Sequence, residues 1–178
     1  KALQEAMQSS WLIMSGIHCH IGSQIFETTG FKIAVQKIFE KLYQWKEKFS
    51  FEASILNLGG GFGIRYTSED DPKPASEYVA EIIAEVKQQA EHYGLNIPEI
   101  GIEPGRSLVG DAGITLYKIG SSKEVPEVRK YLAIDGGMTD NIRPALYQAK
   151  YEAVLANKPL EKTTEVVSIA GKCCESGD

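Results

Sequence analysis

Hydrophobic residues recur with a helical period in two stretches of the first hundred residues. One stretch covers residues 31–49, and the other follows a polar segment at residues 67–74. The apolar stripe of the first comprises Phe31, Ile38, Leu42, Trp45 and Phe49, and that of the second comprises Val79, Ile82, Ile83, Val86 and Ala90. Gly94, a residue type that commonly ends helices, follows the second stripe. The pattern predicts two amphipathic helices.

Short apolar runs of strand length precede, separate and follow these helices, at residues 12–21, 55–58 and 99–102. Strand, helix, strand, helix, strand is the order of a parallel sheet whose connections run through helices. Unusual residues follow each run directly, and in a TIM barrel the loops after the strands form the active site. We therefore expect residues 1–110 to be the C-terminal part of a TIM-like (β/α)8 barrel.

A different pattern follows residue 110. Residues 113–119, 131–134 and 165–170 are β-like, with turn residues and little helical periodicity between them. We expect residues 111–178 to begin a mostly β C-terminal domain with an antiparallel or mixed sheet. The fold class is therefore α/β, with a change of domain near residue 110.

Composition narrows the class of protein. Of the 178 residues, 43% are hydrophobic and 24% charged, which is typical of a folded globular chain. The net charge is -5 and no Lys/Arg cluster occurs, so nucleic acid and anionic membranes are disfavoured as partners. No apolar run approaches the roughly 18 residues of a membrane span, and no signal peptide is recognisable. Cys19, Cys173 and Cys174 are expected to be reduced thiols in a cytoplasmic protein.

Two histidines end the first apolar run. On a strand, His18 and His20 would point to one side and Cys19 to the other. A lone strand histidine is usually a core residue, and we expect this of His18. The pair could also begin a metal site, as in metal-dependent hydrolases, but the only other histidine, His92, lies in a helix pattern facing solvent, so we predict no metal. The following Gly22 allows close approach to the backbone and Ser23 offers a hydroxyl, and both features are suited to binding an anion.

Glycines and an acid follow the second and third runs. Residues 59–63 read Gly-Gly-Gly-Phe-Gly, which lets backbone N–H groups approach a phosphate but lacks the dinucleotide fingerprint. Residues 103–106 read Glu-Pro-Gly-Arg, which in isolation could be a turn with a local ion pair. Beside a phosphate loop, Glu103 could instead hold a pyridinium nitrogen, and Arg106 could bind a phosphate or a carboxylate.

The later part of the chain carries candidate substrate groups. Arg143 and Tyr147 are four residues apart, so one helical turn would bring them to one face, where the arginine suits carboxylate recognition. Such a pair could equally be a solvated surface. Cys173 and Cys174 precede Glu175, and a thiol beside acids suits a proton donor better than a nucleophile.

Six motifs occur in one order along the chain: His-x-His-Ile-Gly-Ser-Gln, Gly-Gly-Gly-x-Gly, Glu-Pro-Gly-Arg, Asp-Gly-Gly-Met-x-Asp, Arg-Pro-Ala-Leu-Tyr and Cys-Glu-Ser-x-Asp. Each is weak alone, but the series resembles the diaminopimelate decarboxylases, which belong to the alanine-racemase-like class of pyridoxal-phosphate enzymes. The resemblance runs from about residue 12 to the last residue. It implies decarboxylation of meso-diaminopimelate to L-lysine by a head-to-tail homodimer with shared active sites.

The resemblance also implies a role for each motif residue. His20 would stack on the cofactor ring, and Glu103 would pair with the ring nitrogen. The phosphate would be held by Ser23, Gly60, Gly61 and the loop of Pro104, Gly105 and Arg106. Arg106, Arg143, Tyr147 and Glu175 would bind the substrate. Cys174 would donate a proton in the partner subunit's site.

Two family features have no match in these 178 residues, namely the Schiff-base lysine of an early barrel strand and a later tyrosine-bearing segment. We therefore expect this stretch alone not to catalyse. Two alternatives stay open within the resemblance. One is an ornithine- or arginine-type decarboxylase, although ornithine-type enzymes carry Asp where Glu175 stands. The other is a non-catalytic pyridoxal-phosphate-binding relative, which a missing lysine upstream would indicate.

Overall fold

The computed structural model describes all residues from 1 to 178 and divides them into two compact units. Unit 1 contains residues 1–65 and 70–112, and unit 2 contains residues 66–69 and 113–178. The short segment 66–69 therefore interrupts unit 1 in the sequence but packs with unit 2. None of the helices combines the length and the apolar character that a membrane span needs.

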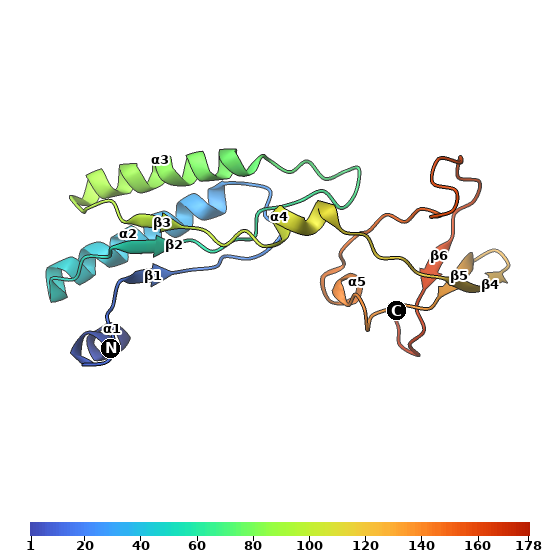
Figure 1. Cartoon of the computed structure of the whole chain (residues 1–178), viewed down its shortest axis with the longest axis horizontal. Helices are drawn as coiled ribbons and strands as arrows, with labels where there is room; N and C mark the ends of the chain where they lie inside the picture. Colours follow the sequence, from blue (N-terminus) through green and yellow to red (C-terminus); the bar gives the residue numbers. More distant parts are fainter. The chain divides into compact units, whose positions relative to one another are not determined.

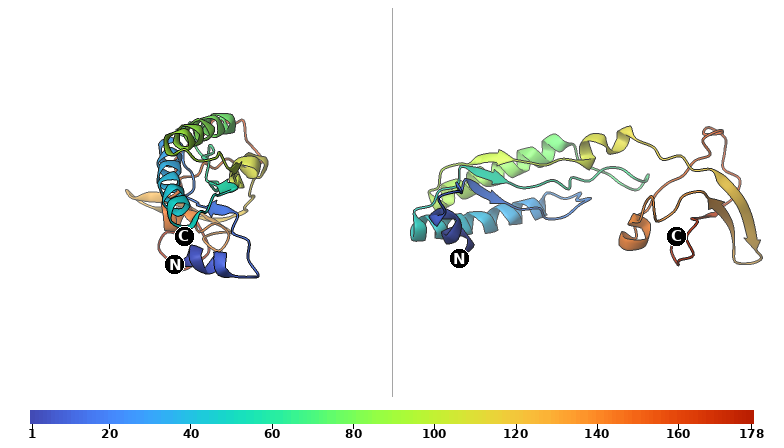
Figure 2. Two further views of the ribbon diagram at one scale, coloured as in Figure 1. Left: turned by 90° about the vertical axis from the view of Figure 1, so that its left-hand side faces the viewer. Right: turned by 60° about the horizontal axis from the view of Figure 1, so that its bottom comes forward.

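Unit 1 is built on a three-stranded parallel sheet in the order β1-β2-β3, formed by Gly16–His18, Ile55–Asn57 and Glu99–Gly101. Helix α1 (Ala2–Gln8) precedes the sheet, whereas α2 (Thr29–Phe49) and α3 (Ala75–Tyr93) connect its strands. These two long helices lie side by side along one face of the sheet (Figures 1 and 2). The predicted alternation of strands and helices is confirmed. Connections between neighbouring parallel strands are almost always right-handed, which brings successive helices to the same face of the sheet.

The core of unit 1 forms where the two helices meet the sheet. Helix α2 buries five apolar residues, α3 buries four, and the second strand region adds two: Phe31, Val35, Ile38, Phe39, Leu42; Tyr78, Ile82, Val86, Ala90; Leu56 and Leu58. The stripe predicted for α2 is correct at its start, but Trp45 and Phe49 only pack against the edge of the core. In α3, Tyr78 is buried while the predicted Val79 and Ile83 are half-buried.

One carboxylate lies inside the α2–α3 contact. Glu85 of α3 is 7% exposed, and its Oε1 accepts hydrogen bonds from Gln36 Nε2 and Gln89 Nε2, both at 2.9 Å. A buried carboxylate without such donors would be costly, so the two amides explain how it is tolerated. At the end of α3, Gly94 adopts φ 61 and closes the helix, as predicted.

The first strand is much shorter than its apolar run. Only Gly16–His18 pair with β2, and the preceding Trp11, Leu12 and Ile13 are 92%, 60% and 95% exposed. The prediction of a strand over residues 12–21 is therefore wrong at both ends. Hydrophobicity predicted the strand itself, but the sheet partner sets its length, because a residue joins a ladder only where a neighbouring backbone is present.

Unit 2 contains a three-stranded mixed sheet. Strand β4 (Ile119–Val125) pairs antiparallel with β5 (Arg129–Ile134), and β5 pairs parallel with β6 (Ser168–Ala170). The strand predicted over 131–134 is confirmed, whereas that over 113–119 is wrong because pairing begins only at Ile119. The run 165–170 forms a strand only in its last three residues. Three short helical segments complete the chain: α4 (Arg106–Val109) and the 3-10 turn η1 (Gly110–Ala112) in unit 1, and α5 (Arg143–Tyr147) in unit 2.

Tyr78 provides a test of how α3 fixes the loop after β1. Its hydroxyl donates to the carbonyls of Ile25 at 2.8 Å and Phe26 at 3.0 Å, while Gly63 N also donates to the Ile25 carbonyl. In the full-length protein, Tyr78→Phe should lower the free energy of unfolding by about 1 kcal/mol, since the Phe26 carbonyl loses its buried donor. Urea unfolding measures this change. Tyr43→Phe, at an exposed tyrosine, should change it far less, and equal losses in the two variants would contradict the role of Tyr78.

Candidate functional site

Three polar side chains meet at the carboxyl ends of the strands of unit 1. The strands end level with each other, because His18 aligns with Asn57 and Asn57 aligns with Gly101. Glu103 follows β3 by two residues, and its backbone N–H donates to the Gly59 carbonyl at 2.7 Å. The edge that the sequence predicted as the site is therefore assembled from all three strands.

The Glu103 carboxylate is held by two of its neighbours. Its Oε2 lies 3.1 Å from His18 Nε2, and its Oε1 accepts a hydrogen bond from Asn57 Nδ2 at 3.0 Å. His18 and Glu103 side chains are 53% and 55% exposed, so the acid is oriented while one side stays open. The expectation that His18 is a core residue is wrong: Cys19, on the opposite side of the strand, is the residue that packs against the core.

Asn57 is a site residue that the motifs did not reveal. Besides donating to Glu103, it accepts a hydrogen bond at Oδ1 from the Gly59 N–H at 2.8 Å, and thus links the acid to the glycine loop. The available signal was its position, since it is the one polar residue in the apolar run 55–58. A polar residue at the end of a buried strand requires hydrogen-bond partners, and here the site supplies them.

The glycine loop makes close backbone contacts with the loops after β1 and β3. A Cβ on Gly60 would lie 2.1 Å from the Glu103 carbonyl oxygen, and one on Gly61 would lie 2.1 Å from that of Gly22. Gly61 also has φ +94, which side chains rarely adopt. Only glycine fits at these two positions, so the loop exposes backbone where a side chain would otherwise project. Such a loop suits a phosphate.

The loop after β1 is fastened to the glycine loop by several hydrogen bonds. Ile25 N donates to the Gly61 carbonyl at 2.9 Å, and Gln24 bonds both the carbonyl of Ile64 at 2.6 Å and its N–H at 3.3 Å. Ser23 is exposed between these contacts. The histidine His20 is also tied to this region, because its Nδ1 accepts from the Gly60 N–H at 3.3 Å. The structure therefore brings His20 and Ser23 beside the glycine loop.

The Glu-Pro-Gly-Arg segment turns from the end of β3 into α4. Pro104 follows the acid, Gly105 is the residue before the helix, and Arg106 is its first residue. Arg106 is half-buried, and it lies on the chain one short turn after Glu103. The Glu103 carboxylate contacts His18 and Asn57, which lie far from it in the sequence. The segment is therefore more than the simple local turn that the motif allowed in isolation.

In unit 2, Asp178 holds two predicted motifs together. Its carboxylate accepts hydrogen bonds from Cys173 N at 2.6 Å and from Met138 N, while Lys172 N donates to the Gly136 carbonyl at 3.0 Å. Cys174 and Glu175 are exposed at this loop. The Asp-Gly-Gly-Met segment and the cysteine segment are thus neighbours, and the first leads directly into α5.

Helix α5 begins at Arg143 and ends at Tyr147, which confirms the predicted helical turn. Tyr147 is 71% exposed, whereas Arg143 is half-buried and its Nη1 donates to the Tyr151 hydroxyl at 2.6 Å. The arginine is therefore held in place and the tyrosine is open to solvent.

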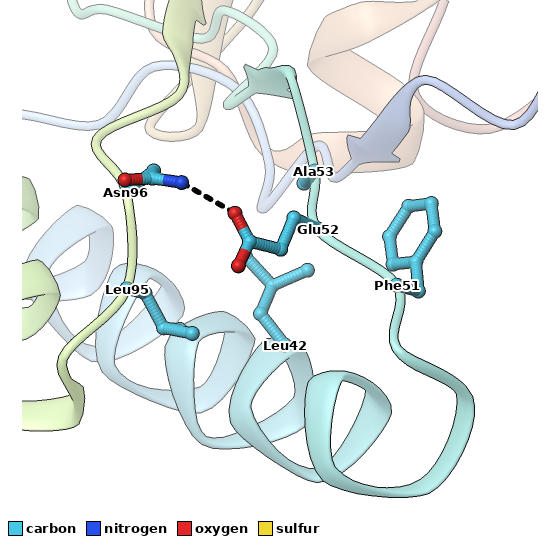
Figure 3. Close-up of a pocket in the computed structure, with 6 residues that line it drawn as sticks. All are labelled: Leu42, Phe51, Glu52, Ala53, Leu95 and Asn96. Carbon is cyan, nitrogen blue, oxygen red and sulfur yellow. Dashed lines mark hydrogen bonds between the residues drawn. The ribbon is translucent and has the colours of Figure 1, made fainter.

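Neither the hollow near the end of α2 nor the arrangement of possible metal-binding side chains points to another site. A hollow between the end of α2 and the segment before β3 measures about 10 Å³, which admits at most one water (Figure 3). It is lined by Leu42, Phe51, Glu52, Ala53, Leu95 and Asn96, and an Asn96 to Glu52 hydrogen bond crosses its rim. Nowhere in the chain do three His, Cys, Asp or Glu side chains gather in a way that could hold a metal ion.

Comparison with known proteins identifies the class. Residues 1–110 match the family described as "Pyridoxal-dependent decarboxylase, pyridoxal binding domain", and the chain belongs to this family. It is 71% identical to the diaminopimelate decarboxylase of Bacillus methanolicus and 63% identical to that of Bacillus subtilis strain 168, in both cases over 100% of the chain. The chain spans 41% and 40% of the lengths of these relatives.

A solved structure supports the same relationship. The diaminopimelate decarboxylase of M. jannaschii, crystallised in complex with L-lysine, matches with a TM-score of 0.85 at 36% sequence identity. The match covers 99% of this chain and 39% of that one. The residues of unit 1 fit the cofactor that the family name implies, because an oriented carboxylate suits a pyridinium nitrogen and a loop of side-chain-free backbone suits a phosphate.

The cysteine loop provides a pH-dependent test. Burial and then the neighbouring Asp178 carboxylate raise the pKa of the Cys173 thiol, while the N–H groups of Met138 and Cys173 lower the pKa of Asp178. Near pH 8 the Cys173 thiol should be mostly protonated and slow to alkylate. Asp178→Asn removes the negative charge, so the pKa should fall and alkylation at Cys173 should accelerate a few-fold.

Mass-spectrometric mapping of iodoacetamide labelling against pH in the full-length protein measures both quantities. An identical pH profile for Cys173 in the wild type and in Asp178→Asn would leave burial as the sole cause of the shift. Ser176→Ala, in the same loop but uncharged, serves as the control.

Proposed function

We propose that this chain forms part of a pyridoxal-phosphate-dependent enzyme that decarboxylates meso-2,6-diaminopimelate to L-lysine. The observation that carries the proposal is the Glu103 carboxylate, oriented by His18 and Asn57 beside the glycine loop. Chemistry of this kind needs an anion at the ring nitrogen and a binding loop for the phosphate. The Glu103 carboxylate and the glycine loop, which could serve as the two, lie at one edge of one sheet. The relatives at 71% and 63% identity support the choice of substrate.

The proposal includes a larger fold. Residues 1–110 would be the C-terminal part of a TIM-like barrel, and residues 111–178 part of a mostly β C-terminal domain. The parallel order β1-β2-β3 with both helices on one face supports the barrel, since each strand and its following helix would repeat around a closed sheet. The proposed site residues follow the carboxyl ends of the strands, which is also where barrel enzymes carry their active sites.

Each cofactor contact is proposed from the position of a residue at that edge. His20 would stack on the pyridine ring, and Ser23, Gly60 and Gly61 would hold the phosphate, with Pro104, Gly105 and Arg106 adjoining it. Glu103 would accept the hydrogen bond of the ring N–H and, as an anion, keep that proton in place. When bound, pyridoxal phosphate supplies an electron sink for the pair of electrons left when carbon dioxide departs.

Residues of several motifs would bind the substrate. Arg106, Arg143 and Tyr147 would bind carboxylates, and the Glu175 carboxylate would accept a hydrogen bond from the substrate's ammonium group. Decarboxylation releases one carbon dioxide and requires one proton at the same carbon. Cys174 would donate this proton, which its exposure supports.

The shared active site is the remaining part of the proposal. Cys174 and Glu175 would reach the site of a second subunit in a homodimer, and their exposed loop is consistent with such a contact.

All three cysteines are free thiols, which supports a reducing, cytoplasmic location.

The charge of Glu103 can be tested separately from its size. In the full-length enzyme, Glu103→Gln should retain the cofactor but lower turnover about 100-fold or more, because a neutral amide cannot keep the ring nitrogen protonated. Absorbance of bound pyridoxal phosphate and carbon dioxide release report the two effects. Glu99→Gln makes the same change at an exposed position of β3 and should behave as wild type. Near-normal turnover in Glu103→Gln would refute the proposed role.

The substrate assignment is tested by competition between amino acids. The full-length enzyme, assayed with meso-diaminopimelate, ornithine and arginine, should prefer the first by about 100-fold or more in kcat/KM. The physical reason is that a site with several carboxylate-binding groups leaves them unpaired when the substrate has one carboxylate. Comparable efficiency with ornithine would overturn the assignment while leaving the decarboxylase class intact.

A further inference from the structure

The guanidinium of Arg143 lies beside two tyrosine rings of unit 2 that contact each other. Its Cζ is 5.0 Å from the centre of the Tyr66 ring and 5.7 Å from that of Tyr151. Its Nη1 also donates to the Tyr151 hydroxyl at 2.6 Å, and the two rings pack edge-on with centres 5.0 Å apart. The arginine is thus fixed by one hydrogen bond and two aromatic contacts.

The segment that carries Tyr66 is fastened to the chain just after α5. Three successive residues make the attachment: Lys150 pairs with Glu69 at 3.1 Å, Tyr151 packs on Tyr66, and the Glu152 carboxylate accepts from Ser68 N at 2.7 Å. The ion pair is 75% exposed on both sides and contributes little by itself. The tyrosine pair lies at the middle of this attachment, next to the arginine.

The partners of Arg143 orient its charge without cancelling it. The ion pairs of unit 2 join lysines to glutamates, at Lys130, Lys150 and Lys158, and Arg143 takes part in none of them. A guanidinium has five N–H donors, of which the Tyr151 hydroxyl uses one. Four donors and the full positive charge remain for an anion, and a planar guanidinium held in this way is prepared for a carboxylate.

Resting on the proposed function, we propose that Tyr66 and Tyr151 are positioning residues that hold Arg143 for the substrate carboxylate that the product retains. Diaminopimelate has two carboxylates, and one of them leaves as carbon dioxide. Binding the departing carboxylate to a guanidinium would stabilise the charge that the reaction must remove, which opposes catalysis. The oriented arginine therefore suits the other carboxylate, which is still present in L-lysine.

The test compares two ligands that differ in this carboxylate. L-lysine carries it, and 1,5-diaminopentane is the same diamine without it. Calorimetric titration of both into the cofactor-loaded full-length enzyme measures the contribution of the carboxylate, and the kcat and KM for meso-diaminopimelate are measured alongside.

Tyr151→Phe removes the hydroxyl and should weaken L-lysine binding about 3- to 10-fold, the range of one hydrogen bond. Tyr66→Leu removes the ring face and should weaken it about 2- to 5-fold, and Tyr66→Phe should restore most of that loss. In both damaging variants KM should rise by a similar factor with kcat within about twofold. Binding of 1,5-diaminopentane should stay unchanged. Glu69→Gln, which loses only the exposed ion pair, should match the wild type.

Two outcomes would overturn the proposal. One is unchanged L-lysine affinity in both Tyr151→Phe and Tyr66→Leu, and the other is an equal loss for L-lysine and 1,5-diaminopentane, which indicates general distortion. Arg143→Gln separates this inference from the function on which it rests. If that variant loses L-lysine affinity while the tyrosine variants do not, only the positioning role fails. An enzyme that does not decarboxylate diaminopimelate would instead refute the proposed function.

Discussion

The alignment of three parallel strand ends is the constraint on which the candidate site depends. Glu103 can accept from His18 and Asn57 at once only because β1, β2 and β3 end at the same level. A slip of one residue in β2 would turn Asn57 to the opposite face of the sheet and replace it with a leucine. The same strand register therefore places the hydrophobic side chains in the core and the polar side chains at the site. Leu56, fully buried under the helices, and Asn57, at the site, are adjacent residues that point to opposite sides.

The helices stabilise this register from behind the sheet. Burial of Phe31, Val35 and Phe39 of α2 against the strands orders the layer beneath the glycine loop. Phe62, which lies within that loop, joins the Phe31 and Tyr78 rings with centres 5.3 and 5.0 Å away. An aromatic anchor at the centre of a glycine-rich segment limits the freedom that its glycines would otherwise give. The backbone can thus approach a ligand closely without becoming disordered.

The sequence predicted elements better than it predicted contacts. The α2 and α3 helices and the Gly94 cap follow from local periodicity and chemistry, so the sequence was sufficient for them. The extent of β1 and the start of β4 depend on partner strands, and the apolar runs at residues 12–14 and 113–117 have no neighbouring strand to pair with. At the site, Glu103 and the glycine loop were predicted from motifs. Asn57 and the partner of His18 were not, because both depend on which residues the parallel register brings side by side.

Glu103 and Arg143, the two charged groups proposed to face the ligands, are both held in place by neighbouring side chains. Glu103 is oriented by the Asn57 amide and the His18 imidazole, and Arg143 by two phenol rings, so neither takes part in a Lys–Glu pair. The surface pairs, such as Lys130 with Glu165, cancel their charges instead. Orientation of Arg143 by uncharged phenol groups lowers the entropy cost of binding while leaving the electrostatic attraction to the ligand nearly intact. A carboxylate in place of Tyr151 would fix Arg143 at least as firmly, but a ligand anion would then have to compete with it.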